Sequence, residues 1–176
     1  MRAWFVVFAV VGLASCSGSA PAPSASPKPE ASGRLATPAP IQAFQAVDID
    51  GRDISFATWQ GKVVVLNVWA TWCAPCRREI PMLAGLQETY RDRLLVIGLL
   101  QDEVTTAFAR EFAKTSRLNY PIVRTTFEIE SRFPPVLMLP STYVIDAAGR
   151  LVAMYVGELD PVVLKKDLEA TFGRVP

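Results

Sequence analysis

The chain has 176 residues, of which 51% are hydrophobic, and its formal net charge is +1. This length holds one domain of ordinary size with short appendages, and a nearly neutral chain without a basic run lacks the electrostatic signature of a nucleic-acid-binding protein. Histidine is absent, which excludes Ser-His and Cys-His catalytic triads, zinc sites of the Cys/His type and a haem-attachment motif.

Residues 1–15 have the pattern of a secretory signal peptide. Arg2 gives a short positive start, and residues 3–13 form an apolar run that is too short to span a bilayer as a permanent helix. The segment Leu13-Ala14-Ser15-Cys16 resembles the lipobox of bacterial lipoproteins, in which the cysteine becomes the acylated first residue. This resemblance predicts an extracytoplasmic protein that is anchored to a membrane through lipidated Cys16. The alternative is an ordinary cleaved signal peptide with a chance cysteine.

Residues 16–40 are rich in Ala, Pro and Ser, with single charges between them. Such a segment buries too little apolar surface to offset the entropy of ordering it. We therefore expect a flexible tether over 16–40, between the lipid anchor and a folded domain over 41–176. The cysteine count agrees with the anchor, because three cysteines in an exported protein leave one unpaired, and lipidation of Cys16 accounts for it.

The folded domain alternates strand-like and helix-like segments. Residues 63–69 are apolar and mostly β-branched, as expected of a central strand that is covered on both faces. Residues 73–90 and 104–117 have helical periodicity, and we expect the second helix to bury Phe108 and Phe112. The other predicted elements are a β-hairpin within 44–54, a strand at 94–100, a second hairpin of strands 141–146 and 151–156, and a helix from Pro161 to about Phe172. This order predicts an α/β fold with a central mixed sheet flanked by helices and an N-terminal β-hairpin extension.

The motif Cys73-Ala74-Pro75-Cys76 follows the buried strand and opens a helix. Two intervening residues bring the sulfurs together within one helical turn, so a disulfide can open and close with little backbone movement. The unpaired N–H groups and positive dipole of a helix N-terminus favour the thiolate. The motif therefore predicts Cys73 as an exposed nucleophile that forms a mixed disulfide with the substrate, and Cys76 as the residue that resolves it. A structural disulfide would gain little from so short a loop, and a zinc site would need a second Cys or His pair.

Residues 68–76, Val-Trp-Ala-Thr-Trp-Cys-Ala-Pro-Cys, resemble the active-site segment of the thioredoxin superfamily. Pro81 matches the proline that kinks the active-site helix of that family. Further matches narrow the resemblance to the TlpA/ResA-like thiol–disulfide oxidoreductases, extracytoplasmic reductases that include cytochrome c maturation factors: Gly61-Lys62, Asn67 and Arg77-Arg78-Glu79. The resemblance covers most of 41–173 and implies a thioredoxin-like fold.

The same resemblance implies roles for residues around the cysteines. Pro140 matches a cis-proline that faces the CxxC motif in this family, and the backbone of Leu139 would pair with a client chain as a short strand. Glu79 matches an acid that helps to move protons during exchange, and desolvation there would raise its pKa. The alternative for Glu79 is a solvated residue in the early turns of a helix. Trp72 is expected to form a partly exposed wall beside Cys73.

These features predict an extracytoplasmic protein disulfide reductase that a membrane thiol donor recharges, with no metal and no cofactor other than the redox-active disulfide Cys73–Cys76. Its expected clients are proteins with oxidised cysteine pairs, and the resemblance favours apocytochrome c or copper-site proteins. Two alternatives belong to other classes. The cysteines and a nearby Met82 or Met138 would hold Cu(I) in a metal-delivery protein. A peroxiredoxin has a similar fold, but it uses a lone peroxidatic cysteine preceded by Pro and Thr.

Overall fold

The computed structural model describes residues 32–55, 59 and 61–173. The predicted signal peptide, Cys16 and residues 16–31 of the predicted tether lie outside these residues. The described strands are β1 (Gly33–Pro40), β2 (Gln45–Val47), β3 (Asp53–Ser55), β4 (Val63–Trp69), β5 (Leu94–Leu100), β6 (Ile122–Arg124), β7 (Ser141–Ile145) and β8 (Arg150–Val156). Six of them form one sheet in the order β1-β8-β7-β4-β5-β6, and β2 and β3 form a separate antiparallel hairpin.

The main sheet is mixed, as the sequence predicts. Strand β4 runs parallel to β5, and β5 parallel to β6, whereas β7, β8 and β1 pair in antiparallel fashion. All seven residues of β4 are buried. Val63 and Val65 contact one hydrophobic layer, and Val64 and Leu66 contact the other. This alternation confirms a central strand that is covered on both faces.

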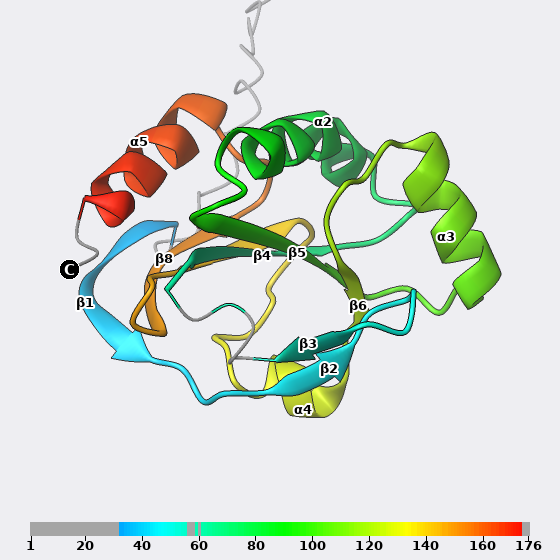
Figure 1. The fold of residues 1–176 in the computed structure, drawn as a ribbon, viewed down its shortest axis with the longest axis horizontal. Coiled ribbons are helices and arrows are strands. Elements are labelled where there is room, and N and C mark those ends of the chain that lie inside the picture. Colours follow the sequence, from blue (N-terminus) through cyan, green and yellow to red (C-terminus); the bar gives the residue numbers. More distant parts are fainter. Residues whose placement is uncertain (1–31, 56–58, 60, 174–176) are drawn as a thin grey trace, which may run out of the picture.

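The helices α2 (Ala74–Thr89), α3 (Thr106–Thr115), α4 (Phe127–Glu130) and α5 (Pro161–Phe172) surround the sheet. Figure 1 shows α2 and α5 on one face of the sheet, the β2–β3 hairpin and α4 on the other, and α3 beside the β6 edge. Leu83 of α2 and Leu164 of α5 are fully buried in the first layer. The predicted α/β fold, with helices on both sides of a mixed sheet and an N-terminal hairpin, is thus confirmed. None of the described helices is long and apolar enough to cross a membrane.

Strand β1 corrects the predicted boundary of the tether. Residues 33–40 pair with β8 at the edge of the sheet, starting with Gly33 opposite Met154. The prolines that favoured a tether are compatible with an edge strand, because only one side of such a strand is hydrogen-bonded. Arg34 adds a side-chain anchor, since its guanidinium donates to the Thr171 hydroxyl of α5 at 3.1 Å. The folded domain therefore begins earlier than the sequence predicts.

Helix α3 buries less of its surface than predicted. Phe112 is partly buried and packs against Trp69, with ring centroids 5.4 Å apart, but Phe108 is 52% exposed. The prediction that both rings are buried is therefore wrong for Phe108 and met only in part by Phe112. The helix lies beside the sheet edge, and the residue that it buries fully is Ala109. Strand β6 and helix α4 were not predicted, because three or four residues are too short to show a periodic pattern.

Gly98 of β5 leaves space for the indole of Trp69. A Cβ atom at Gly98 would lie 2.7 Å from Trp69 Nε1 and 3.4 Å from a ring carbon of Tyr120. Because the indole is buried against Phe112, it has little room to move away. We expect Gly98→Ala to lower the free energy of unfolding by about 1–3 kcal/mol, as measured by urea denaturation.

Gly85, on the exposed side of α2, is the matched control. A Cβ atom there would meet nothing within 4 Å, so Gly85→Ala is expected to stabilise the protein by about 0.5–1 kcal/mol through its higher helix propensity. An unfolding midpoint of Gly98→Ala equal to that of the wild-type protein would contradict the tight packing of Trp69 over this strand.

Candidate active site

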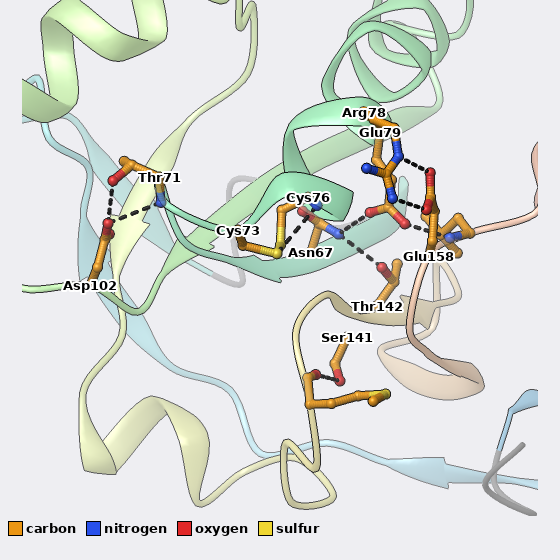
Figure 2. The surroundings of a disulfide bond; sticks show 12 residues. Asn67, Thr71, Cys73, Cys76, Arg78, Glu79, Asp102, Ser141, Thr142 and Glu158 are labelled. Carbon is orange, nitrogen blue, oxygen red and sulfur yellow. Dashed lines mark hydrogen bonds and ion pairs between the residues drawn. A yellow bond between two sulfur atoms is a disulfide. The ribbon is translucent and has the colours of Figure 1, made fainter. Parts of the chain in front are cut away.

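The CxxC motif lies where β4 leaves the sheet. After the buried residues Trp69 and Ala70, the chain turns into α2 with Cys73 as the N-cap, whose N–H donates to the Ala70 carbonyl at 3.1 Å. Cys73 and Cys76 form a disulfide, with their Cα atoms 5.3 Å apart (Figure 2). The Cys76 N–H donates to Cys73 Sγ at 3.3 Å, a contact that stabilises a thiolate at a helix N-terminus. Pro75 lies in the first turn, where a missing N–H costs little.

Both sulfur-bearing residues are shielded in the disulfide form. Cys73 is 4% exposed and Cys76 is 1% exposed. The prediction of an exposed Cys73 is therefore wrong for this form, because the end of β4 packs the motif into a hydrophobic cluster with Trp69 and Leu100. Trp72, which precedes Cys73, is 69% exposed, which agrees with its predicted position at the surface.

A carboxylate that the sequence analysis did not single out holds the segment before Cys73. The Thr71 N–H donates to Asp102 Oδ2 at 2.9 Å, and the Thr71 hydroxyl donates to the same oxygen. Because β4 and β5 are parallel, the residues that follow them meet at one edge of the sheet. The available signal in the sequence was an acid soon after the second buried strand. This contact fixes the backbone two residues before the disulfide.

Glu79 lies on α2 one turn after Cys76, so the two residues lie on the same side of the helix. It is only 3% exposed. Its Oε1 accepts a hydrogen bond from the Leu159 N–H, and its Oε2 accepts one from Asn67 Nδ2 at 3.2 Å. Asn67 Nδ2 also donates to Thr142 Oγ1 at 3.0 Å (Figure 2). The alternative of a solvated Glu79 is therefore wrong.

Burial raises the pKa of Glu79 to about 7, even though the hydrogen bonds from Leu159 and Asn67 lower it. The charge of Glu158 adds to the increase, and that of Arg78 opposes it. A carboxyl group with a pKa near neutrality can accept or release a proton at physiological pH. The helix that opens with the disulfide thus also carries a buried carboxyl group that can titrate near neutral pH.

The loop before β7 borders the disulfide. The Leu139–Pro140 peptide bond is cis, as predicted. Leu139 packs against the cluster that contains Cys73 and Cys76. The Pro140 carbonyl accepts a hydrogen bond from the Gly157 N–H at 2.8 Å, whereas the backbone N–H and C=O of Leu139 form no hydrogen bond within the described residues. The loop therefore presents unpaired backbone groups next to the cysteines.

A CxxC disulfide that opens the helix after a central strand, beside a cis-proline loop, defines a thiol–disulfide oxidoreductase with a thioredoxin-like fold. Residues 37–154 match the AhpC/TSA family. The thiol–disulfide oxidoreductase ResA of Bacillus thuringiensis subsp. konkukian is 31% identical over 116 residues, which cover 65% of this chain and 66% of ResA. The chain belongs to the AhpC/TSA family and, within it, to the TlpA/ResA-like thiol–disulfide oxidoreductases.

Two further similarities agree with this placement. The thioredoxin-like protein YneN of Bacillus subtilis is 34% identical over 128 residues, which are 72% of each chain. A thiol:disulfide interchange protein of the thioredoxin family from Chlorobium tepidum TLS superposes with a TM-score of 0.72 at 29% identity, over 79% of this chain and 99% of that protein. The superposition confirms the thioredoxin-like fold.

The raised pKa of Glu79 predicts a specific dependence of stability on pH. Between its ordinary value of 4.5 and its folded value of about 7, the folded state binds more protons at Glu79 than the unfolded state does. This carboxyl group therefore destabilises the fold increasingly as the pH rises through that range. We expect the free energy of unfolding of Glu79→Gln, relative to that of wild type, to increase by on the order of 2 kcal/mol when the pH is raised from about 5 to about 8. Urea denaturation at both pH values measures this change, and an equal difference at both would contradict the raised pKa.

Proposed function

We propose that the protein is an extracytoplasmic reductase that reduces disulfides of client proteins through Cys73 and Cys76. The observation that carries this proposal is a CxxC pair at a helix N-terminus with a buried acid one turn further on, whose pKa is about 7. The name of ResA as a thiol–disulfide oxidoreductase supports the class of reaction. The dipeptide Ala74-Pro75 supports the reducing direction, because it lacks the histidine of strongly oxidising DsbA-like enzymes.

The reaction proceeds in two exchange steps. The Cys73 thiolate attacks one sulfur of the client disulfide, that S–S bond breaks, and the other client sulfur leaves as a thiolate that takes up a proton. Cys76 then loses its proton and attacks Cys73 Sγ, which breaks the mixed disulfide and releases the second client thiol. Two electrons pass to the client, its two thiolates take up two protons from the solvent, and Cys73–Cys76 becomes a disulfide. A membrane thiol donor returns two electrons to regenerate the dithiol.

In this mechanism Glu79 takes the proton that Cys76 loses. Its position one turn after Cys76 and its pKa of about 7 support this role, because a general base works best with a pKa near the working pH. Asn67 and the Leu159 N–H orient the carboxylate. When the dithiol is regenerated, the same group returns the proton.

The client chain is proposed to lie between Trp72 and the cis-proline loop. The free backbone groups of Leu139, next to Pro140, support strand-like pairing with an extended client segment. The exposed side chains of Leu137 (67%) and Met138 (52%) offer apolar contacts beside that backbone. The family resemblance favours clients with oxidised cysteine pairs, such as apocytochrome c or copper-site proteins.

No contact within the described residues favours the alternative of Cu(I) delivery. Of the two methionines that this alternative invokes, Met82 packs with the α2–α5 layer and Met138 is 52% exposed. A peroxiredoxin mechanism would need a lone peroxidatic cysteine, whereas Cys73 is paired with Cys76. Disulfide exchange therefore remains the proposed activity.

The experiment that tests the function is the reduction potential of Cys73–Cys76. The protein is prepared as Cys16→Ser, so that it carries only these two thiols, and is equilibrated with defined thiol/disulfide buffers before the free thiols are trapped. We expect a value near or below that of thioredoxin, about −270 mV. A value near that of DsbA, about −120 mV, would overturn the reducing direction. If no reversible couple appears and the reduced protein binds Cu(I) stoichiometrically, the activity itself is refuted.

Single substitutions separate the roles of the two cysteines. Cys76→Ser is expected to accumulate a mixed disulfide between Cys73 and a disulfide-containing peptide, because the resolving thiol is missing. Cys73→Ser is expected to form none. Mass spectrometry of the trapped adduct distinguishes these outcomes, and an adduct on Cys76 would reverse the assignment.

We also propose that lipidated Cys16 anchors the protein outside the cytoplasm, an inference supported by the lipobox-like segment that ends at this residue. Cys16→Ser removes the acylation site. We expect the full chain to sediment with membranes in a bacterial host and the variant to appear in the soluble fraction, as measured by immunoblot. Membrane association that survives the substitution would refute the lipid anchor.

A further inference from the structure

The loop between β8 and α5 connects three parts of the site. The Gly157 N–H donates to the Pro140 carbonyl at 2.8 Å, and the Leu159 N–H donates to Glu79 Oε1. Between these two residues, Glu158 forms a two-point ion pair with a residue of α2. Figure 2 shows this pair, in which Arg78 Nε lies 2.9 Å from Glu158 Oε1 and Nη2 lies 2.6 Å from Oε2.

We propose that Arg78 and Glu158 are positioning residues for Glu79. Their ion pair holds the 157–159 loop against α2, so that the Leu159 N–H stays on the Glu79 carboxylate and the loop keeps water away from it. The proposal deepens the proposed function, since its consequence for catalysis rests on proton transfer by Glu79. The contacts that carry it do not depend on the direction of electron flow.

The helix and the loop are joined by an outer and an inner contact. Arg78 and Glu79 are neighbours on α2, but the Arg78 side chain is 58% exposed whereas Glu79 is buried. Glu158 and Leu159 repeat this arrangement in the loop, with side-chain exposure of 43% for Glu158 and a buried Leu159. The bidentate arginine–carboxylate geometry fixes both distance and orientation. The outer ion pair therefore sets where the inner N–H donor lies.

The expected energetic effect is local. An ion pair at the surface contributes little to the global free energy of unfolding. Opening of one loop, however, requires only a part of that free energy, so a small contribution changes the open population measurably. Loss of the pair should consequently appear in the exchange of the Leu159 amide hydrogen and not in the unfolding midpoint.

The charged groups around Glu79 determine how its pKa responds to a substitution of Arg78. In the oxidised protein, the ionisable groups near it are Arg78 on its own helix, Glu158 from the loop and Tyr120 before β6, while β4 and β7 contribute the neutral Asn67 and Thr142. Arg78 by its charge alone lowers the pKa of Glu79. Burial is the largest cause of the raised pKa. Removing Arg78 thus has opposite effects through charge and through loop position.

Arg78→Ala separates these two effects. If Arg78 acted only as a nearby cation, its removal would raise the pKa of Glu79. If it positions the loop, its removal lets water reach the carboxylate and also loosens the Leu159 hydrogen bond, which by itself would raise the pKa. Because burial is the largest cause of the shift, its loss outweighs the loss of this hydrogen bond, and the pKa falls toward the ordinary value of a glutamate. We expect the fall, measured by an NMR titration of the ¹³C-labelled Glu79 carboxyl in the oxidised protein. We also expect the Leu159 amide hydrogen to exchange about two- to fivefold faster.

Arg77→Ala is the matched control, because Arg77 is the adjacent exposed residue and forms no ion pair among the described residues. It should leave both readouts unchanged. Glu158→Gln should also accelerate Leu159 exchange, and the charge swap R78E/E158R should restore it. A rise in the pKa of Glu79, or an unchanged Leu159 exchange rate, in Arg78→Ala overturns the proposal. Because the oxidised protein is used, an oxidising potential at Cys73–Cys76 would refute the reductase without affecting this result.

Discussion

Strand β4 is buried on both faces along all seven residues, and the positions of the other site residues follow from this burial. The chain is still inside the protein when it reaches the cysteines, so Cys73 and Cys76 are shielded in the disulfide form. Burial also places the polar side chain of Asn67 within the sheet, where it must find hydrogen-bond partners. It finds them in Glu79 and Thr142, which links the central strand to the active-site helix and to β7.

Glu79 illustrates how a stability cost can supply chemistry. An ionised carboxylate in the interior is costly unless polar contacts compensate it. Here the Leu159 N–H and Asn67 compensate in part, and the pKa of Glu79 comes to rest at about 7. Stronger hydrogen bonding would keep the Glu79 carboxylate ionised at neutral pH. An apolar side chain in its place would have no proton to exchange. The partial compensation lets one group both accept and release a proton.

The loops at this edge of the sheet are anchored to one another. Asp102 holds the Thr71 backbone just before the disulfide. The loop after β8 holds both the Pro140 carbonyl and the Glu79 carboxylate through its backbone N–H groups. Movement of the cis-proline loop is thereby connected by hydrogen bonds to the environment of Glu79. Under the proposed function, a client that pairs with Leu139 would act on Glu79 through this connection.

The sequence by itself determined the features that depend on neighbouring residues: the CxxC motif, the buried β4, the start of α2 and the signal-like N-terminus. Periodicity and motif spacing encode these directly. The resemblance to a known family added the cis-proline and the place of Glu79. Only the tertiary structure decided the partners of Glu79, the anchoring of Thr71, the exposure of Phe108 and the pairing of β1 with β8. These depend on segments that are distant in the chain, such as Glu79 and Leu159, and one sequence carries no record of which distant segments meet.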